Sequence, residues 1–354
     1  MLPAFTWPAV IYLGIFVLHL VLPANRVEGY VKDAHGRPLR YRLNGLLVFF
    51  VTVGLWMVAC RQGLLAWDAF YLHRWEMAAG ACGLGLLFTL FMVLPAPRVP
   101  GWNFGKELYL GRVEQPQWLG GRVDAKMFLY LIGAVLLELN LLSFAAHHAM
   151  TWASDRSPGV VLYLALFSFF LVEYLWFERV HLYTYDFVAE RVGFKLGWGC
   201  FVFYPFFYSV GLWTTAELPD PRWPTAAYVG IAVMFFTGWA FARGANLQKY
   251  WFKRDPSKKV FGVVPEALEG RVLVNGFWGL SRHINYLGEL LMSSALALSL
   301  GHPEVLGPWL YPIYYLVLLI PRQLDDDKRC AAKYGPLWDT YRARVRWRIV
   351  PYVW

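Results

Sequence analysis

Long apolar runs recur along the whole 354-residue chain, and they constrain its fold more than any other feature. A run of about 17–25 mainly apolar residues can cross a bilayer as a helix. Only 16% of the residues are charged, against roughly 25% in soluble domains. The sequence therefore predicts an all-α, polytopic membrane protein, built as one helical bundle of about nine transmembrane helices. The nine expected spans lie near residues 4–23, 44–60, 77–95, 127–149, 159–178, 194–214, 225–242, 286–301 and 308–321.

The lysines and arginines between these runs predict the orientation of the bundle, because cytoplasmic loops are enriched in both residues. Of the 33 lysines and arginines, 28 fall in alternate loops that share one side and 4 fall in the other loops. An arrangement with the N-terminus outside and the C-terminus in the cytoplasm follows. The same bias accounts for the net charge of +9, so a nucleic acid partner is not expected.

The cysteines and histidines predict neither a disulfide framework nor a metal site. The four cysteines are scattered without a CxxC pair, and zinc sites need such close spacing. Membrane di-iron enzymes need clustered histidines, whereas only His147 and His148 are adjacent here. The first apolar run also lacks the basic start and cleavage site of a signal peptide, so we expect it to be retained.

The stretch from Leu273 to Glu289, LVNGFWGLSRHINYLGE, is not typical of a plain membrane span. It places Arg282, His283 and Asn285 close together, and unpaired polar groups in hydrocarbon are costly. Polar and ionisable residues inside membranes mark functional sites by default. We expect a broken or re-entrant segment that lines a polar cavity and enters from the cytoplasmic side.

Two further segments on the predicted cytoplasmic side combine cations with aromatic rings. The first is a basic loop from Arg243 to Arg271, and the second is the tail that begins at Arg322. Cations suit phosphate groups, and flat rings suit bases, so the segments together predict a phosphorylated, ring-bearing cofactor. The helical spacing of five tail residues predicts one mainly aromatic face, interrupted near Gly335: Cys330, Tyr334, Leu337, Trp338 and Tyr341.

These segments resemble the sterol reductase family, which includes delta-14 and delta-7 sterol reductases and the membrane domain of the lamin B receptor. The specific motifs are GFWGLSRHINYLGE, RGANLQK about thirty residues before it, and DDDKRCAAKYGPLWDTYRARVRWRIVP after it. YTYDFVAERVGFKLGWGCFVFYPFFYS, DAKMF and YRLNG extend the resemblance over nearly the whole chain. Members with ten spans would have one more N-terminal span than this chain.

The resemblance implies an NADPH-dependent oxidoreductase that acts on a CH–CH group, and specifically on a sterol ring double bond such as delta-14. It implies a sterol that enters from the bilayer, and a location in the endoplasmic reticulum or a bacterial inner membrane. Metal is not implied. The implied cofactor positions are Lys249, Lys253, Leu273, Trp278, Asn285, Tyr286, Asp326, Cys330, Ala331, Ala332, Lys333, Tyr334 and Tyr341.

The chemistry of such a reduction requires an acid. An isolated alkene accepts hydride poorly, so one carbon must first be protonated before the nicotinamide delivers hydride to the other. Glu289 is the first candidate for the proton donor, at a position where the family usually carries Asp. The other candidates are Tyr286, Asp326 and Tyr341.

Residues 243–354 keep the family pattern better than residues 1–215, which are expected to form the substrate side. Glu178 and Asp186 match acidic family positions there, but Leu129 to Val135 is plain apolar where the family is polar. In the cofactor half, Lys253 stands where the family usually has Arg. Two other interpretations are a membrane methyltransferase related to isoprenylcysteine carboxyl methyltransferases, using S-adenosylmethionine, and a non-catalytic sterol-binding or scaffold protein.

Overall fold

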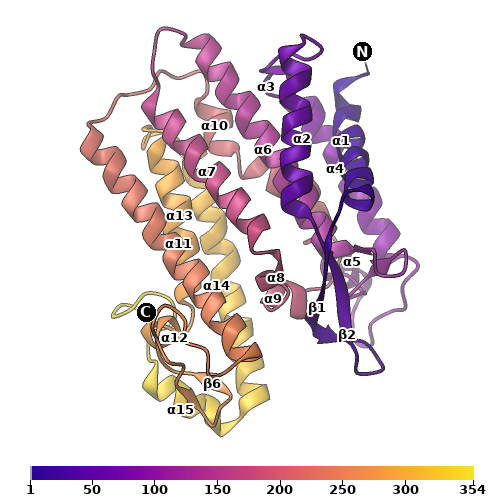
Figure 1. The fold of residues 1–354 in the computed structure, drawn as a ribbon, viewed down its shortest axis with the longest axis vertical. Coiled ribbons are helices and arrows are strands. Elements are labelled where there is room, and N and C mark those ends of the chain that lie inside the picture. Colours follow the sequence, from indigo (N-terminus) through magenta and orange to yellow (C-terminus); the bar gives the residue numbers. More distant parts are fainter. Residues whose placement is uncertain (1) are drawn as a thin grey trace. The chain divides into compact units, whose positions relative to one another are not determined.

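The computed structural model describes residues 2–354, most of which are helical (Figure 1). The chain divides into two compact units, Met1–Pro219 and Asp220–Trp354. Five helical segments are long and apolar enough to cross a membrane: Ala4–Val21, Arg74–Val93, Ala125–Thr151, Pro158–Trp176 and Thr225–Arg254. The prediction of a mainly helical membrane protein is confirmed. The nine spans and their orientation stay predictions.

The N-terminal unit is organised around α6 (Ala125–Thr151), which is the most buried of the five segments. Within its apolar 18-residue stretch 83% of the residues are buried, against 22–44% in the other four segments. The Asp124 side chain starts this helix by accepting hydrogen bonds from the backbone N–H groups of Lys126 and Met127, both at 3.1 Å. The elements of this unit are η1 (Ala4–Thr6), α1 (Trp7–Val21), β1 (Asn25–Lys32), β2 (Pro38–Leu43), α2 (Gly45–Arg61), α3 (Ala69–Leu72), α4 (Arg74–Val93), α5 (Phe104–Leu110), β3 (Gln117–Trp118), β4 (Val123–Asp124), α6 (Ala125–Thr151), α7 (Pro158–Trp176), α8 (Glu178–His181), α9 (Tyr185–Val188), η2 (Gly199–Phe207) and α10 (Val210–Thr215).

The sixth expected span, 194–214, stays a prediction as a span, but its helix is irregular. It contains the π-helix η2, with Pro205 inside it, followed by the short α10. A wide π turn and a proline change the usual pairing of backbone carbonyls. The Asn140 side chain donates to the Pro205 carbonyl at 2.8 Å, and the Tyr12 hydroxyl donates to the Phe201 carbonyl at 2.9 Å. Polar side chains of neighbouring helices therefore satisfy this irregular backbone.

In the C-terminal unit, α11, α13 and α14 run side by side (Figure 1). Gly238 of α11 faces Gly288 of α13, and a Cβ on Gly238 would lie 2.6 Å from the Gly288 carbonyl. The two backbones therefore touch, as small residues allow in membrane helices. The elements of this unit are α11 (Thr225–Arg254), β5 (Ala267–Leu268), β6 (Val272–Leu273), α12 (Phe277–Leu280), α13 (Ile284–Ser299), α14 (Leu306–Tyr334) and α15 (Pro336–Arg344).

Two helices extend beyond their expected ends. α11 was expected to end near 242, with a basic loop after it, but it continues to Arg254, so Lys249 and Lys253 lie on a helix. It stops before Pro256, which disfavours helical conformation in the preceding residue. α14 was expected to end near 321 and continues to Tyr334. The predicted interruption is confirmed, because Gly335 adopts a φ of 56° and α15 starts at the next residue.

Candidate functional site

The stretch between β6 and α13 is broken, as predicted, and α11 holds it in place. The Gln248 side chain donates to the Asn275 carbonyl at 3.0 Å and accepts from the Phe277 N–H at 3.0 Å. Gly276 between them has a φ of 61°, and a Cβ there would collide with the Gln248 amide. Gln248 was not among the predicted site residues, although its place in RGANLQK was the available signal.

The C-terminal tail fixes the other end of this stretch. The Ser281 hydroxyl donates to the Ile349 carbonyl at 2.8 Å, and the His283 N–H donates to the Arg348 carbonyl at 2.8 Å. The guanidinium of Arg282 pairs with Asp327 at 3.1 Å. Arg282 therefore joins the broken stretch to α14, a role that the sequence did not reveal.

Hydrogen bonds hold both the side chain and the backbone carbonyl of Trp278 of α12, and a lysine lies near its ring. Its indole N–H donates to the Ala245 carbonyl at 2.9 Å, and its own carbonyl accepts from the Tyr341 hydroxyl at 3.2 Å. Burial raises the pKa of Tyr341. Lys249 places its Nζ 5.5 Å from the centroid of the indole ring. The structure thus brings together three residues that the sequence assigned to the cofactor.

Lysines from two helices gather near Cys330 of α14. The positive charges of Lys249 and Lys333 act on both Lys253 and Cys330. Burial raises the pKa of Cys330 to about 12, and Asp326 adds to this effect, so the thiol is neutral. Cations held together repel one another, and an anionic group between them would relieve that repulsion.

His283 and Tyr286 form a stacked pair at the start of α13, with ring centroids 4.9 Å apart. His283 Nδ1 lies 3.9 Å from Asp326 Oδ2, too far for a hydrogen bond. Burial lowers the pKa of His283 to about 3, so the ring is neutral and the two do not form an ion pair. Within residues 2–354, His283 Nε2 and Asn285 Oδ1 are buried without a hydrogen-bond partner.

The remaining predicted residues occupy the edges of this group. Glu289 is half-buried on α13, one turn after Asn285. Leu273 is buried in β6, whereas Ala331, Ala332 and Lys333 are exposed on α14. The predicted tail face is confirmed, because five residues pack in one cluster with Val272 of β6 and the nearby Val274: Cys330, Tyr334, Leu337, Trp338 and Tyr341.

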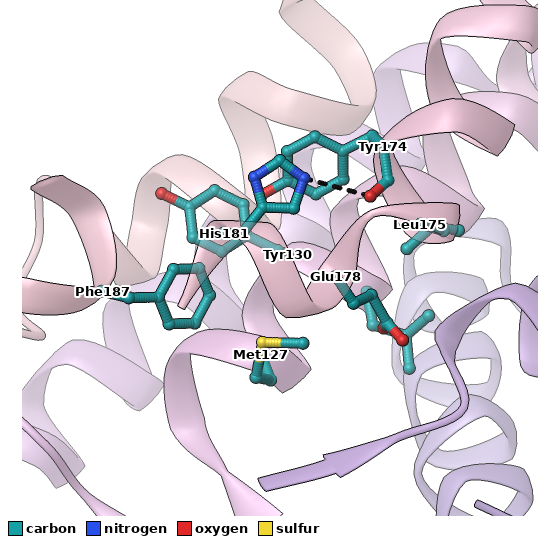
Figure 2. A pocket seen from close by; sticks show the side chains of 8 residues that line it. Met127, Tyr130, Tyr174, Leu175, Glu178, His181 and Phe187 are labelled. Carbon is teal, nitrogen blue, oxygen red and sulfur yellow. Dashed lines mark hydrogen bonds between the residues drawn. The ribbon is translucent and has the colours of Figure 1, made fainter. Parts of the chain in front are cut away.

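The N-terminal unit has a narrow pocket with space for about one water molecule (Figure 2). Glu178 lines it, whereas Asp186, the other predicted residue, does not. Both carboxyl oxygens of Glu178 accept from the Gly45 N–H at 3.2 Å, and burial raises the Glu178 pKa to about 8. A side chain on Gly45 would collide with this carboxyl group. The full lining is Met127, Tyr130, Leu131, Tyr174, Leu175, Glu178, His181 and Phe187.

Two polar side chains of this pocket, Glu178 and His181, are bonded within the unit. His181 Nε2 lies 3.1 Å from the Tyr174 carbonyl, and the rings of these two residues stack with centroids 4.0 Å apart (Figure 2). Tyr41 of β2 packs with Met127 and Phe187 in one apolar cluster.

Residues 4–354 match the profile of the family described as "Ergosterol biosynthesis ERG4/ERG24 family". The chain is 31% identical to the Delta(14)-sterol reductase of Arabidopsis thaliana, with 94% of this chain and 91% of the relative covered. It is 34% identical to Delta(14)-sterol reductase TM7SF2 of Mus musculus, over 97% of this chain and 84% of the relative. It is 28% identical to 7-dehydrocholesterol reductase of Xenopus laevis, over 99% of this chain and 81% of the relative.

Proposed function

The chain belongs to the ergosterol biosynthesis ERG4/ERG24 family, and on this premise we propose that it reduces the delta-14 double bond of a sterol with NADPH. The observation that carries the proposal is the match across residues 4–354, with relatives named Delta(14)-sterol reductase at 31% and 34% identity. The match favours a reductase over the methyltransferase interpretation. It also identifies the chain as an oxidoreductase of sterol metabolism in a membrane.

The C-terminal unit fits a phosphorylated dinucleotide. The lysines near Cys330 provide cations for phosphate groups, and the fixed indole of Trp278 provides a flat face. The buried unpaired atoms His283 Nε2 and Asn285 Oδ1 offer hydrogen bonds to a bound group. When bound, NADPH supplies a hydride. In this proposal Lys249, Lys253 and Lys333 hold the phosphates, and Trp278 and Tyr341 position the base or ring.

We assign the proton donor to Glu289. Its half-buried place near the start of α13, one turn from Asn285, allows it to serve a lipid substrate while the cofactor occupies the other side. The Tyr341 hydroxyl already donates to the Trp278 carbonyl, which favours a positioning role for this tyrosine. Asp326 and Tyr286 remain the alternative donors. In this proposal the sterol enters from the bilayer.

The membrane arrangement belongs to the same proposal. Nine spans with the C-terminus in the cytoplasm would place the lysines of α11 and α14 on the side where NADPH is available. Cysteine labelling from either side of sealed vesicles, with single cysteines introduced at Lys258 and Ser154, tests this orientation. We expect opposite accessibility at the two positions, and equal accessibility would contradict it.

The activity is tested with the purified full chain in lipid, given NADPH and a sterol with an 8,14-diene. We expect NADPH oxidation and the matching monoene, identified by mass spectrometry. A delta-7 sterol given in parallel should react much more slowly. Reduction of the delta-7 bond alone would reassign the substrate. Methyl transfer from S-adenosylmethionine, or no turnover with any sterol, would overturn the proposal.

A further inference from the structure

Gln323 of α14 is the most completely unpaired polar side chain of the C-terminal unit. Its side chain is fully buried, and neither Nε2 nor Oε1 has a hydrogen-bond partner among the described residues. A buried amide in that state is costly unless something pairs with it. A group that offers both a donor and an acceptor would satisfy both atoms of the Gln323 amide.

The helix register shows where this amide points. Gln323 precedes Asp326 and Asp327 by three and four residues, so all three share one face of α14. That face meets the start of α13, because Asp327 pairs with Arg282 at 3.1 Å and Asp326 lies 3.9 Å from His283. The unpaired atoms of His283 and Asn285 belong to the same region.

The face of α14 that carries the Gln323 amide also carries Lys333 further along the helix. Ten residues separate Gln323 from Lys333, which corresponds to about 15 Å along a helix. Asp326 and Cys330 lie between them at helical spacing. An extended dinucleotide with its phosphates at the lysine end would carry its nicotinamide ring toward Gln323.

We propose that Gln323 binds the carboxamide of the nicotinamide ring through paired hydrogen bonds and thereby positions the ring. The Gln323 Nε2 donates to the carboxamide oxygen, and Oε1 accepts from the carboxamide N–H, which satisfies both buried atoms. This inference rests on the proposed function, because it assumes NADPH as the cofactor. Gln323 is not among the residues that the family resemblance implies for the cofactor.

The test compares NADPH with its 3-acetylpyridine analogue, in which a methyl ketone replaces the carboxamide. The analogue keeps the acceptor and lacks the donor, so Gln323 Oε1 would remain unpaired. Calorimetric titration of the purified full chain should show wild type binding NADPH about tenfold more tightly than the analogue. Gln323→Met should bind both dinucleotides equally.

Controls separate this role from a structural one. Without cofactor, Gln323→Met should melt at or above the wild-type temperature, because it removes an unpaired buried amide. Asn140→Leu alters another fully buried amide, whose Nδ2 is bonded to Pro205, so it should lower the melting temperature and keep the tenfold preference. A tenfold preference retained by Gln323→Met would overturn the proposal.

The comparison of NADPH with the analogue in the wild-type protein is itself a test of the Gln323 assignment. The assignment therefore stays testable even if a variant fails to fold. Equal binding of NADPH and the analogue by wild type refutes the Gln323 assignment, even if sterol reduction is observed. Failure of the proposed function would differ, since neither dinucleotide would bind and no sterol would be reduced.

Discussion

The two units treat buried polar side chains differently. In the N-terminal unit, Glu178 accepts from Gly45, and the Lys126 ammonium donates to the carbonyls of Asp186 and Phe187 at 3.0 and 3.1 Å. Glu138 and Asn140 there each leave one atom unpaired but bond through another atom, although Trp56 and Trp152 leave their indole N–H groups unpaired. In the C-terminal unit, by contrast, both polar atoms of the Gln323 amide lack a partner among the described residues.

This difference separates polar groups that stabilise the fold from those that the proposal pairs with a ligand. A paired buried group stabilises helix contacts in a membrane protein, and a wholly unpaired one carries a free-energy cost that bound ligand can offset. The C-terminal unit also holds lysines close enough to repel one another. Both features fit the proposal that the C-terminal unit binds the cofactor, and the following experiments challenge that division.

The largest expected effect concerns carboxyl groups, one from each unit. Glu289→Gln removes the proposed proton donor, so turnover should fall by about 10²–10⁴-fold while NADPH affinity stays within about twofold. Glu138→Gln changes a buried carboxyl group of the N-terminal unit that bonds to Ser168 at 2.8 Å, and it should keep turnover within several-fold of wild type. Steady-state kinetics and calorimetric binding measure both effects. Normal turnover in Glu289→Gln would move the donor role to Asp326 or Tyr286.

A smaller effect is expected from lysines that lie over tryptophan rings. Lys249→Ala removes a proposed counter-ion of the phosphates and should weaken NADPH binding about tenfold or more. Lys106, whose Nζ lies 4.4 Å from the Trp102 ring centroid, is a matched pair in the N-terminal unit. Lys106→Ala should leave the dissociation constant unchanged. Equal losses in both variants would show a general charge effect and break the comparison between the units.

The smallest effect is the pH dependence of stability, which should have opposite signs in the two units. The raised pKa of Glu178, about 8 against 4.5, means that its stabilisation is complete below pH 4.5 and is lost as pH rises to about 8. The lowered pKa of His283, about 3 against 6.5, means that its stabilisation is complete above pH 6.5 and is lost as pH falls toward 3. Each slope is at most about 1.4 kcal/mol per pH unit.

Hydrogen-exchange mass spectrometry of peptides from each unit measures these slopes separately. Glu178→Gln should flatten the slope of the N-terminal peptides between pH 5 and 8, roughly the interval between its two pKa values. His283→Gln should flatten the C-terminal slope below pH 6.5. Slopes of the same sign in both units would contradict the protonation states assigned here.

Much of the site was predictable because its signals are local. Helical spacing alone predicted that Trp338 and Tyr341 share a face with Cys330, and the three pack in one cluster. The concentration of polar residues around His283 predicted a break, because a continuous apolar span would not tolerate them. The family resemblance, confirmed by the match across residues 4–354, added the catalytic class.

Some local signals were misread because tertiary contacts override them. The basic residues after 242 suggested a loop, but α11 continues through them and uses Gln248 to hold the turn at Gly276. The sixth span looked uniformly apolar, yet η2 interrupts it, and Asn140 on a distant part of the chain bonds the displaced Pro205 carbonyl. Gln248 is distant in sequence from Gly276, and Asn140 is distant from Pro205.

The sequence by itself determined the membrane class, the family and the segments that carry cations and rings, because composition and short-range spacing encode these. Only the tertiary structure decided which polar atoms are paired. Glu178 is satisfied by the N–H of Gly45, 133 residues away, whereas Gln323 is buried without a hydrogen-bond partner in the part of the chain that the structure describes. Hydrogen bonding depends on distances of about 3 Å between atoms, and only the folded chain sets those distances.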